Sequence, residues 1–158
     1  MAELLLINLL IYFLMNGAQI FETLVFVPRW ATGNLQNLSI LNSEIKSANL
    51  KYFWIVFHSV HEIVFLSSVV FCFEIDGVGK QLVILFFIHV FIRIWTVTYF
   101  AQKIIKFQKV AENRSLEPSE NIDKQIKTWV ILNYLRVSLY IGISILMVPL
   151  TIIALKAK

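Results

Sequence analysis

Four long apolar segments, separated by shorter polar ones, dominate the pattern of hydrophobic and polar positions along the chain. A helix needs about 20 mostly apolar residues to cross the hydrocarbon core of a bilayer, and each segment reaches that length. The pattern therefore predicts an all-α fold, a transmembrane four-helix bundle forming a single domain of residues 1–158. The predicted spans are Leu4–Val27, Tyr52–Phe73, Gln81–Ile105 and Thr128–Leu155.

The three connections differ in character. Residues 28–51 are rich in asparagine, and a short helix is expected over Leu38–Ala48. Glu74–Lys80 contains an Asp-Gly pair and a second glycine, which predicts a tight turn. Residues 106–127 are charged and are expected to extend the third helix past the membrane before the chain turns back.

Composition supports the membrane assignment. Of 158 residues, 58% are hydrophobic and 15% charged, with a mean hydropathy of +0.74, whereas soluble domains are about 45–50% apolar and about 25% charged. The single cysteine, Cys72, excludes an intrachain disulfide and any CxxC motif. The chain has no basic patch interleaved with exposed aromatic residues, so we expect the lipid bilayer, and no nucleic acid, as its partner.

The net charge of +4 is distributed unevenly between the two sides of the predicted membrane. By the positive-inside rule, the basic first and third loops are cytoplasmic and both termini lie outside, as expected for a multi-pass protein of a bacterial inner membrane. The opposite side carries only Lys80, Lys156 and Lys158. The first and third loops carry Arg29, Lys46, Lys51, Lys103, Lys106, Lys109, Arg114, Lys124 and Lys127.

Ionisable side chains within the spans are the most informative feature of the sequence. Each costs about 2.5–3.5 kcal/mol at the centre of a membrane helix, so each needs a partner or water. Steps of three and four residues place them on one face of each helix, and we expect these four polar faces to turn inward. The groups are Glu22, His58, His61, Glu62, His89, Arg93 and Arg136, joined by Asn16, Gln19, Asn133 and Tyr140.

Counting along each helix at about 1.5 Å per residue places most of these groups in the cytoplasmic half of the bundle. Two acids and two arginines also balance in charge, as a buried cluster must. The sequence therefore predicts one shared site formed by Glu22, His58, Glu62, Arg93, Asn133 and Arg136.

Acid–base chemistry on a lipophilic substrate needs no cofactor and fits this set. A buried carboxylate can remove a proton while an arginine stabilises negative charge on a substrate oxygen. The competing interpretation is a pair of structural salt bridges, Glu22–Arg136 and Glu62–Arg93, that fix the helix register. The expected catalytic residues are Glu22, His58, Glu62, Arg93 and Arg136. The expected substrate-binding residues are Asn16, Trp54, Trp95, Asn133 and Tyr140.

A metal ion or a haem is an alternative cofactor for the same cluster. The candidate metal ligands are His58, His61, Glu62 and His89, and a four-helix membrane bundle can ligate haem iron through histidines on facing helices. The HxxHE spacing differs from the HExxH zinc motif, and the paired ExxH motifs of di-iron proteins are absent from the sequence. The cofactor therefore stays open between a metal ion, a haem and none.

Transport is the alternative from a different functional class. Glu22, on the first of four predicted spans, resembles the membrane-embedded glutamate of small multidrug transporters, which exchange protons for cationic drugs. Those chains are shorter and lack this number of histidines and arginines, and fixed arginines would repel a cation. A non-enzymatic small-molecule transporter or binding protein is retained as the second hypothesis.

Several short phrases resemble those of small four-span bacterial membrane proteins of unknown function, similar in size and span pattern to the anthrone-oxygenase-like family. The resemblance covers most of the chain. It implies an oxidoreductase or oxygenase acting on a small hydrophobic or aromatic substrate, and it supplies no catalytic motif that transfers residue by residue. Oligomeric state, including a homo-oligomer, is left open. The phrases are Asn16-Gly17, Glu22, Pro28-Arg29-Trp30, Phe53-Trp54, His58-Ser59-Val60-His61-Glu62, His89-x3-Arg93-x-Trp95 and Asn133-Tyr134-x-Arg136.

Overall fold

The computed structural model describes residues 2–32, 37–42, 50–112 and 119–157. These residues contain helices and turns and no strand, and four helical rods are long and apolar enough to cross a membrane. The predicted all-α transmembrane four-helix bundle is therefore confirmed. The four rods are Ala2–Trp30, Tyr52–Cys72, Gly79–Glu112 and Asn121–Lys156.

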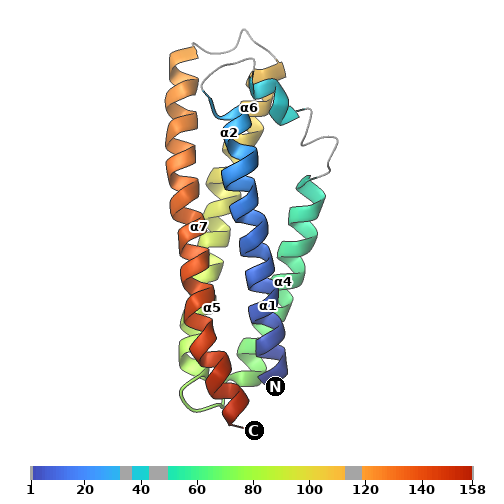
Figure 1. Ribbon diagram of the computed structural model, residues 1–158, viewed down its shortest axis with the longest axis vertical. Coiled ribbons are helices and arrows are strands. Elements are labelled where there is room, and N and C mark those ends of the chain that lie inside the picture. Colours follow the sequence, from blue (N-terminus) through green and yellow to red (C-terminus); the bar gives the residue numbers. More distant parts are fainter. Residues whose placement is uncertain (1, 33–36, 43–49, 113–118, 158) are drawn as a thin grey trace.

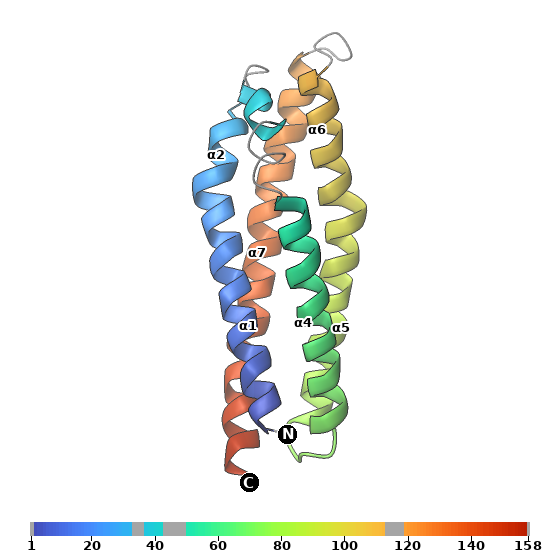
Figure 2. The ribbon, with the colours of Figure 1, turned by 90° about the vertical axis from the view of Figure 1, so that its right-hand side faces the viewer.

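The four rods pack as a closed ring of antiparallel neighbours. α1 (Ala2–Phe21) packs against α4 (Leu50–Cys72) and against α7 (Ser119–Lys156), while α5 (Gly79–Trp95) completes the ring by packing against α4 and α7. Figures 1 and 2 show this order from two directions. Each rod therefore has one face directed to the bundle interior and another directed to the lipid.

The first and third rods each contain one π-helical turn. η1 (Glu22–Phe26) continues α1 into α2 (Val27–Trp30), and η2 (Thr96–Ala101) continues α5 into α6 (Gln102–Glu112). Pro28 has no N–H to donate to the preceding turn and its ring crowds a carbonyl there, which accounts for the wider turn before it. Such turns are rare and occur frequently at functional sites.

Both chain termini lie at one end of the bundle, together with the turn between α4 and α5 (Figure 1). We call this the terminal end. The opposite end, which we call the loop end, holds α2, α6 and the first turns of α7. The helix over residues 37–42 agrees with the start of the short helix expected over Leu38–Ala48, and residues 43–48 of that prediction lie outside the described residues. The third rod continues to Glu112, as its charged extension predicted.

The turn between α4 and α5 depends on two glycines. Gly77 has a φ of 74°, a left-handed conformation that residues with a Cβ rarely adopt. A Cβ on Gly79 would overlap the Phe73 carbonyl oxygen and lie 2.6 Å from its carbon. The N–H groups of Val78 and Gly79 donate to the Ile75 carbonyl at 3.0 and 3.1 Å. The predicted tight turn is confirmed, and its glycines have specific steric roles.

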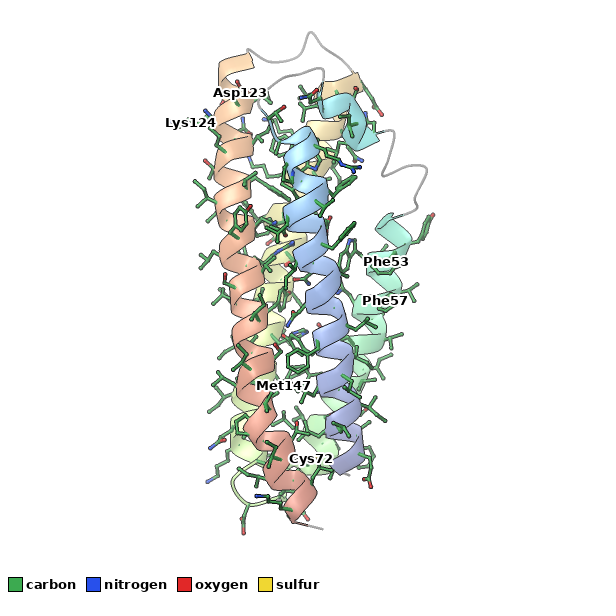
Figure 3. The ribbon with its side chains drawn as sticks, viewed as in Figure 1. Phe53, Phe57, Cys72, Asp123, Lys124 and Met147 are labelled. Atoms are coloured by element: carbon green, nitrogen blue, oxygen red, sulfur yellow. The ribbon has the colours of Figure 1, made fainter. Side chains whose placement is uncertain are left out.

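Two apolar clusters fill the interior at different heights. The cluster toward the terminal end contains Leu5, Cys72, Leu82 and Met147, and Figure 3 labels two of these low in the bundle. The cluster toward the loop end is rich in aromatic rings. The buried ionisable residues border both clusters, because Tyr12, which contacts His89, belongs to the first and Phe100, which contacts Arg136, belongs to the second. The loop-end cluster includes Trp30, Leu38, Phe100, Phe107, Ile122 and Trp129.

Candidate functional site

Five polar side chains from α1, α4 and α5 form one hydrogen-bonded network, which we call the Glu62 network. The Tyr12 hydroxyl lies 2.8 Å from His89 Nδ1, and His89 Nε2 lies 2.8 Å from Glu62 Oε1. Arg93 Nε donates to the same Glu62 oxygen at 3.0 Å, and Arg93 Nη1 lies 2.9 Å from His58 Nε2. The network joins three of the four rods inside the bilayer.

The partners in the network assign its protons. A carboxylate accepts and a guanidinium only donates. His89 therefore donates from Nε2 to Glu62 and accepts at Nδ1 from the Tyr12 hydroxyl. His58 accepts at Nε2 from Arg93, so its proton is on Nδ1. Arg93 Nε also lies 3.3 Å from His89 Nε2, and we assign its hydrogen bond to the nearer Glu62 oxygen. The result is a directed chain of donors from Tyr12 to Glu62.

The ion pair between Glu62 and Arg93 is the charged centre of this network. Their side chains are 32% and 12% exposed, and His89 beside them is fully buried. In a bilayer an isolated charge at this position would be costly, and pairing removes most of that cost. The Glu62–Arg93 salt bridge that the sequence suggested is present.

A second polar group lies on α7 and the π-helical turn η1. Asn133 Nδ2 donates to Thr23 Oγ1 at 3.0 Å, and Arg136 Nη2 donates to Asn133 Oδ1 at 2.7 Å. The Arg136 guanidinium lies 4.5 Å from the centre of the Phe100 ring on η2. Glu22 interacts electrostatically with Arg136, although the described ion pairs do not include a direct one between them. Both π-helical turns therefore contact the polar segment of α7.

Tyr140 lies between the two groups. The Arg93 guanidinium carbon is 5.2 Å from the centre of its ring, and Arg136 is close enough to interact electrostatically with it. Among the buried donors without a hydrogen-bond partner in the described residues are His58 Nδ1–H, Arg136 Nε–H and the Tyr140 hydroxyl, and the ring N–H of the neighbouring His61 is another. The first three belong to side chains near Arg93: His58 accepts a hydrogen bond from it, the Tyr140 ring lies 5.2 Å from it, and Arg136 interacts with it electrostatically. The His58 Nδ1–H bond points to the side of the ring that is turned away from Arg93. Buried donors without acceptors are costly, so the arrangement suits a ligand with an acceptor oxygen.

The remaining predicted substrate-binding residues have different surroundings. Asn16 Nδ2 donates to Ser144 Oγ at 2.9 Å, next to Tyr140 on α7. Trp54 stacks on His58, with ring centres 5.1 Å apart and an angle of 26° between the planes. Trp95 instead packs edge-on against Phe100, with ring centres 5.1 Å apart, in the aromatic cluster of the loop end. The structure therefore places Trp54 beside the network and Trp95 outside it.

The four predicted metal ligands are neighbours without forming a ligand shell. Within the described ranges, no group of three or more His, Cys, Asp or Glu side chains is arranged to hold a metal ion. His58, Glu62 and His89 are engaged by the network. His61 is fully buried, and its ring meets Tyr12 and His89 edge-on at 4.6 and 5.0 Å between centres. Neither ring nitrogen of His61 has a hydrogen-bond partner in the described part of the chain.

Sequence analysis missed two contributors on the inward face of α1. Tyr12 lies four residues before Asn16 on the same face of the helix, and its bond to His89 was not foreseen. Asn8, fully buried, was not considered, although it lies four residues before Tyr12 and eight before Asn16 and so continues the same face. The step of four residues was the signal that would have identified it. Neither amide atom of Asn8 has a partner among the residues that the structure describes.

Replacing Asn8 by the isosteric Leu should raise the free energy of unfolding by about 1–2 kcal/mol, because it removes two unsatisfied buried polar atoms. Denaturation of the protein in nanodiscs or mixed micelles measures the change. Asn16→Leu is the matched control and should lower stability by about 1 kcal/mol, because it breaks the bond to Ser144. Equal losses in both variants would contradict the prediction and mean that Asn8 has a partner.

Comparison with known proteins finds no matching family model, no matching curated protein and no matching solved structure. Function is therefore inferred from the geometry of the site.

Proposed function

We propose that this protein is an intramembrane enzyme, an oxidoreductase or oxygenase, that acts on a small lipophilic substrate at the Glu62 network. The observation that carries the proposal is the presence of unpaired buried donors on three side chains near Arg93, those of His58, Arg136 and Tyr140. A carboxylate able to accept a proton, that of Glu62, is bonded to Arg93. Formation of an enolate or phenolate requires a base that removes a proton and hydrogen-bond donors that stabilise the negative oxygen.

The substrate in this proposal carries a carbonyl or hydroxyl oxygen. That oxygen accepts a hydrogen bond from an unpaired donor beside Arg93, the Tyr140 hydroxyl or Arg136 Nε–H, and negative charge that develops on it is stabilised by Arg93 and Arg136. Such stabilisation is stronger in a low-dielectric interior than in water. Both described hydrogen bonds to Glu62 end on Oε1, so Oε2 is the oxygen that takes the substrate proton.

Loss of a proton makes an electron-rich anion that an oxidant such as dioxygen can attack or oxidise. This favours an oxidoreductase or oxygenase, the class that the resemblance to the anthrone-oxygenase-like family also implies. Glu22 has a different role from Glu62 in this scheme. It balances the charge of Arg136, while Asn133 holds that arginine in place through the 2.7 Å bond.

The predicted metal or haem ligands do not fit a metal centre in this arrangement. Arg93 donates to Glu62 and contacts His58, so a permanent positive charge lies among the atoms that would ligate a cation. Both ring nitrogens of His89 are also engaged, by Tyr12 and Glu62. We assign no step to a metal ion or haem.

Location and orientation belong to the same proposal. We place the protein in a bacterial inner membrane with the loop end in the cytoplasm and both termini outside. The basic residues of α6 and of the start of α7, which lie at the loop end, support this orientation by the positive-inside rule.

Glu62→Gln tests the proposal, because the amide keeps the shape of the side chain and cannot act as a base. Oxygen consumption is followed for protein in nanodiscs with a panel of lipophilic phenols and aromatic ketones. We expect turnover to fall by about a hundredfold, the lower part of the range for loss of a general base. Thermal unfolding verifies that the variant is folded.

Glu74→Gln is the matched control, because Glu74 is exposed in the turn at the terminal end and should leave turnover unchanged. Equal turnover in wild type and folded Glu62→Gln would overturn the proposed role of Glu62. Saturable binding of the panel by wild type without turnover would favour the transport or binding-protein hypothesis.

A further inference from the structure

A cleft of about 460 Å³ lies between α1 and α4. Four aromatic side chains line it: Phe13 from α1, and Phe53, Trp54 and Phe57 from α4. Figure 3 shows Phe53 and Phe57 on the half of α4 nearer the loop end. The volume is that of a small-molecule site and too small for a further helix.

The cleft owes its depth on the α1 side to Gly17. A Cβ at this position would have no heavy atom within 4 Å, so the helix surface there is bare and open. Gly17 also lines the cleft directly. Ala18, the next residue, also lines the cleft, so two small residues leave the backbone of α1 accessible to a ligand there.

The mouth of the cleft faces the lipid. Phe13 and Phe53 are exposed at 44% and 38% on the outside of the bundle, where the surroundings are acyl chains. A ligand therefore enters sideways from the bilayer. Its transfer gains little from the hydrophobic effect, because the lipid it leaves is as apolar as the cleft.

The preference of the cleft for a ligand over a lipid acyl chain must then come from more specific contacts. Aromatic rings gain energy from stacked and edge-on contacts beyond the area that they bury, which an acyl chain does not. A polar group that reaches the network adds to this preference. Trp54 provides the connection, because it lines the cleft and stacks on His58, whose Nε2 lies 2.9 Å from Arg93.

We propose that the cleft between α1 and α4 is the entry and binding site for a small ring-bearing molecule dissolved in the bilayer, and that Gly17 sets the size of the ligand it admits. This deepens the proposed function and rests on it for the chemistry that follows binding. The ring lies between Phe13 and the aromatic side chains of α4. The oxygen substituent is directed past Trp54 toward His58 and Arg93.

Gly17→Leu fills the cleft without backbone strain and provides the test. Gly142→Leu is the matched control, because Gly142 is also a helical glycine with no heavy atom within 4 Å of a Cβ and it does not line the cleft. The probes are a brominated naphthol and a brominated decanol, which share a hydroxyl and differ in having a ring or a chain. Bromine quenches tryptophan fluorescence on contact. The Trp54→Phe variant shows how much of the quenching comes from Trp54 and how much from the other tryptophans.

In nanodiscs the brominated naphthol should quench Trp54 saturably, with an affinity at least about tenfold above that of the brominated decanol. Gly17→Leu should weaken its binding by at least about tenfold, and Gly142→Leu should leave it unchanged. Equal binding by the two glycine variants, or equal binding of the two probes, would overturn the proposal. The binding test and the turnover test are independent. Binding in the cleft can be absent while Glu62→Gln still lowers turnover, and binding can be present while Glu62→Gln leaves turnover unchanged.

Discussion

Replacing Arg93 by Met should lower the free energy of unfolding by about 3–5 kcal/mol, the cost of breaking a buried ion pair by removing one partner. Arg93 donates to Glu62 at 3.0 Å and contacts His58 at 2.9 Å, and its side chain is only 12% exposed. Methionine keeps the length of the side chain and removes its charge. Glu62, whose side chain is 32% exposed, then keeps the hydrogen bond from His89 but has no cation beside it to balance its charge inside the bilayer. Reversible unfolding in mixed micelles measures the loss.

The double variant Glu62→Gln with Arg93→Met removes both charges and should recover most of this stability. The two groups are in direct contact, so their effects are expected to be strongly non-additive. A loss in Arg93→Met below about 0.5 kcal/mol would contradict the importance of the pair, since that is the size of an ordinary surface change. A stable double variant without turnover would show that the pair has more than a structural role.

Gly79→Ala should be strongly destabilising for the addition of a single methyl group, with an expected loss of about 4 kcal/mol in the free energy of unfolding. The added Cβ would overlap the Phe73 carbonyl oxygen, and backbone atoms cannot move away as a flexible side chain can. The turn between α4 and α5 must therefore shift, along with the hydrogen bonds from Val78 and Gly79 to Ile75. Unfolding in mixed micelles measures the effect.

Gly142→Ala is the control for this prediction, because a Cβ there has no heavy atom within 4 Å. It should be neutral or stabilise the helix by about 0.5–1 kcal/mol, the usual difference between glycine and alanine in a helix. If Gly79→Ala were tolerated as well as Gly142→Ala, the close packing of the turn against Phe73 would be refuted.

Much of the site followed from helix geometry applied to single residues. Sequence analysis suggested a Glu62–Arg93 salt bridge, and the structure joins the two side chains directly. Asn133 and Arg136, three residues apart on one face, are bonded to each other at 2.7 Å. These predictions work because a membrane helix has a constant rise and rotation and must direct its polar face away from lipid.

Other features depended on departures from that regularity. Glu22 begins a π-helical turn, in which each turn contains more residues than in an α-helix. Its electrostatic partner is Arg136, which the salt-bridge interpretation had paired with it, and it does not join the Glu62 network, although the prediction of a single shared site implied that it would. Trp95 immediately precedes the other π-helical turn and packs into the loop-end cluster instead of the predicted substrate site.

The sequence by itself determined the four spans and their inward polar faces, because the bilayer penalises polar groups that face lipid. It also determined the tight turn, because the Asp-Gly pair and the second glycine favour one. Only the tertiary structure decided which polar groups meet and where the bundle is open to lipid. The cleft joins Gly17 and Phe13 of one helix to Phe53, Trp54 and Phe57 of another. Its existence depends on the relative rotation and separation of two helices, which are set by packing over their whole length and not by the local pattern of either one.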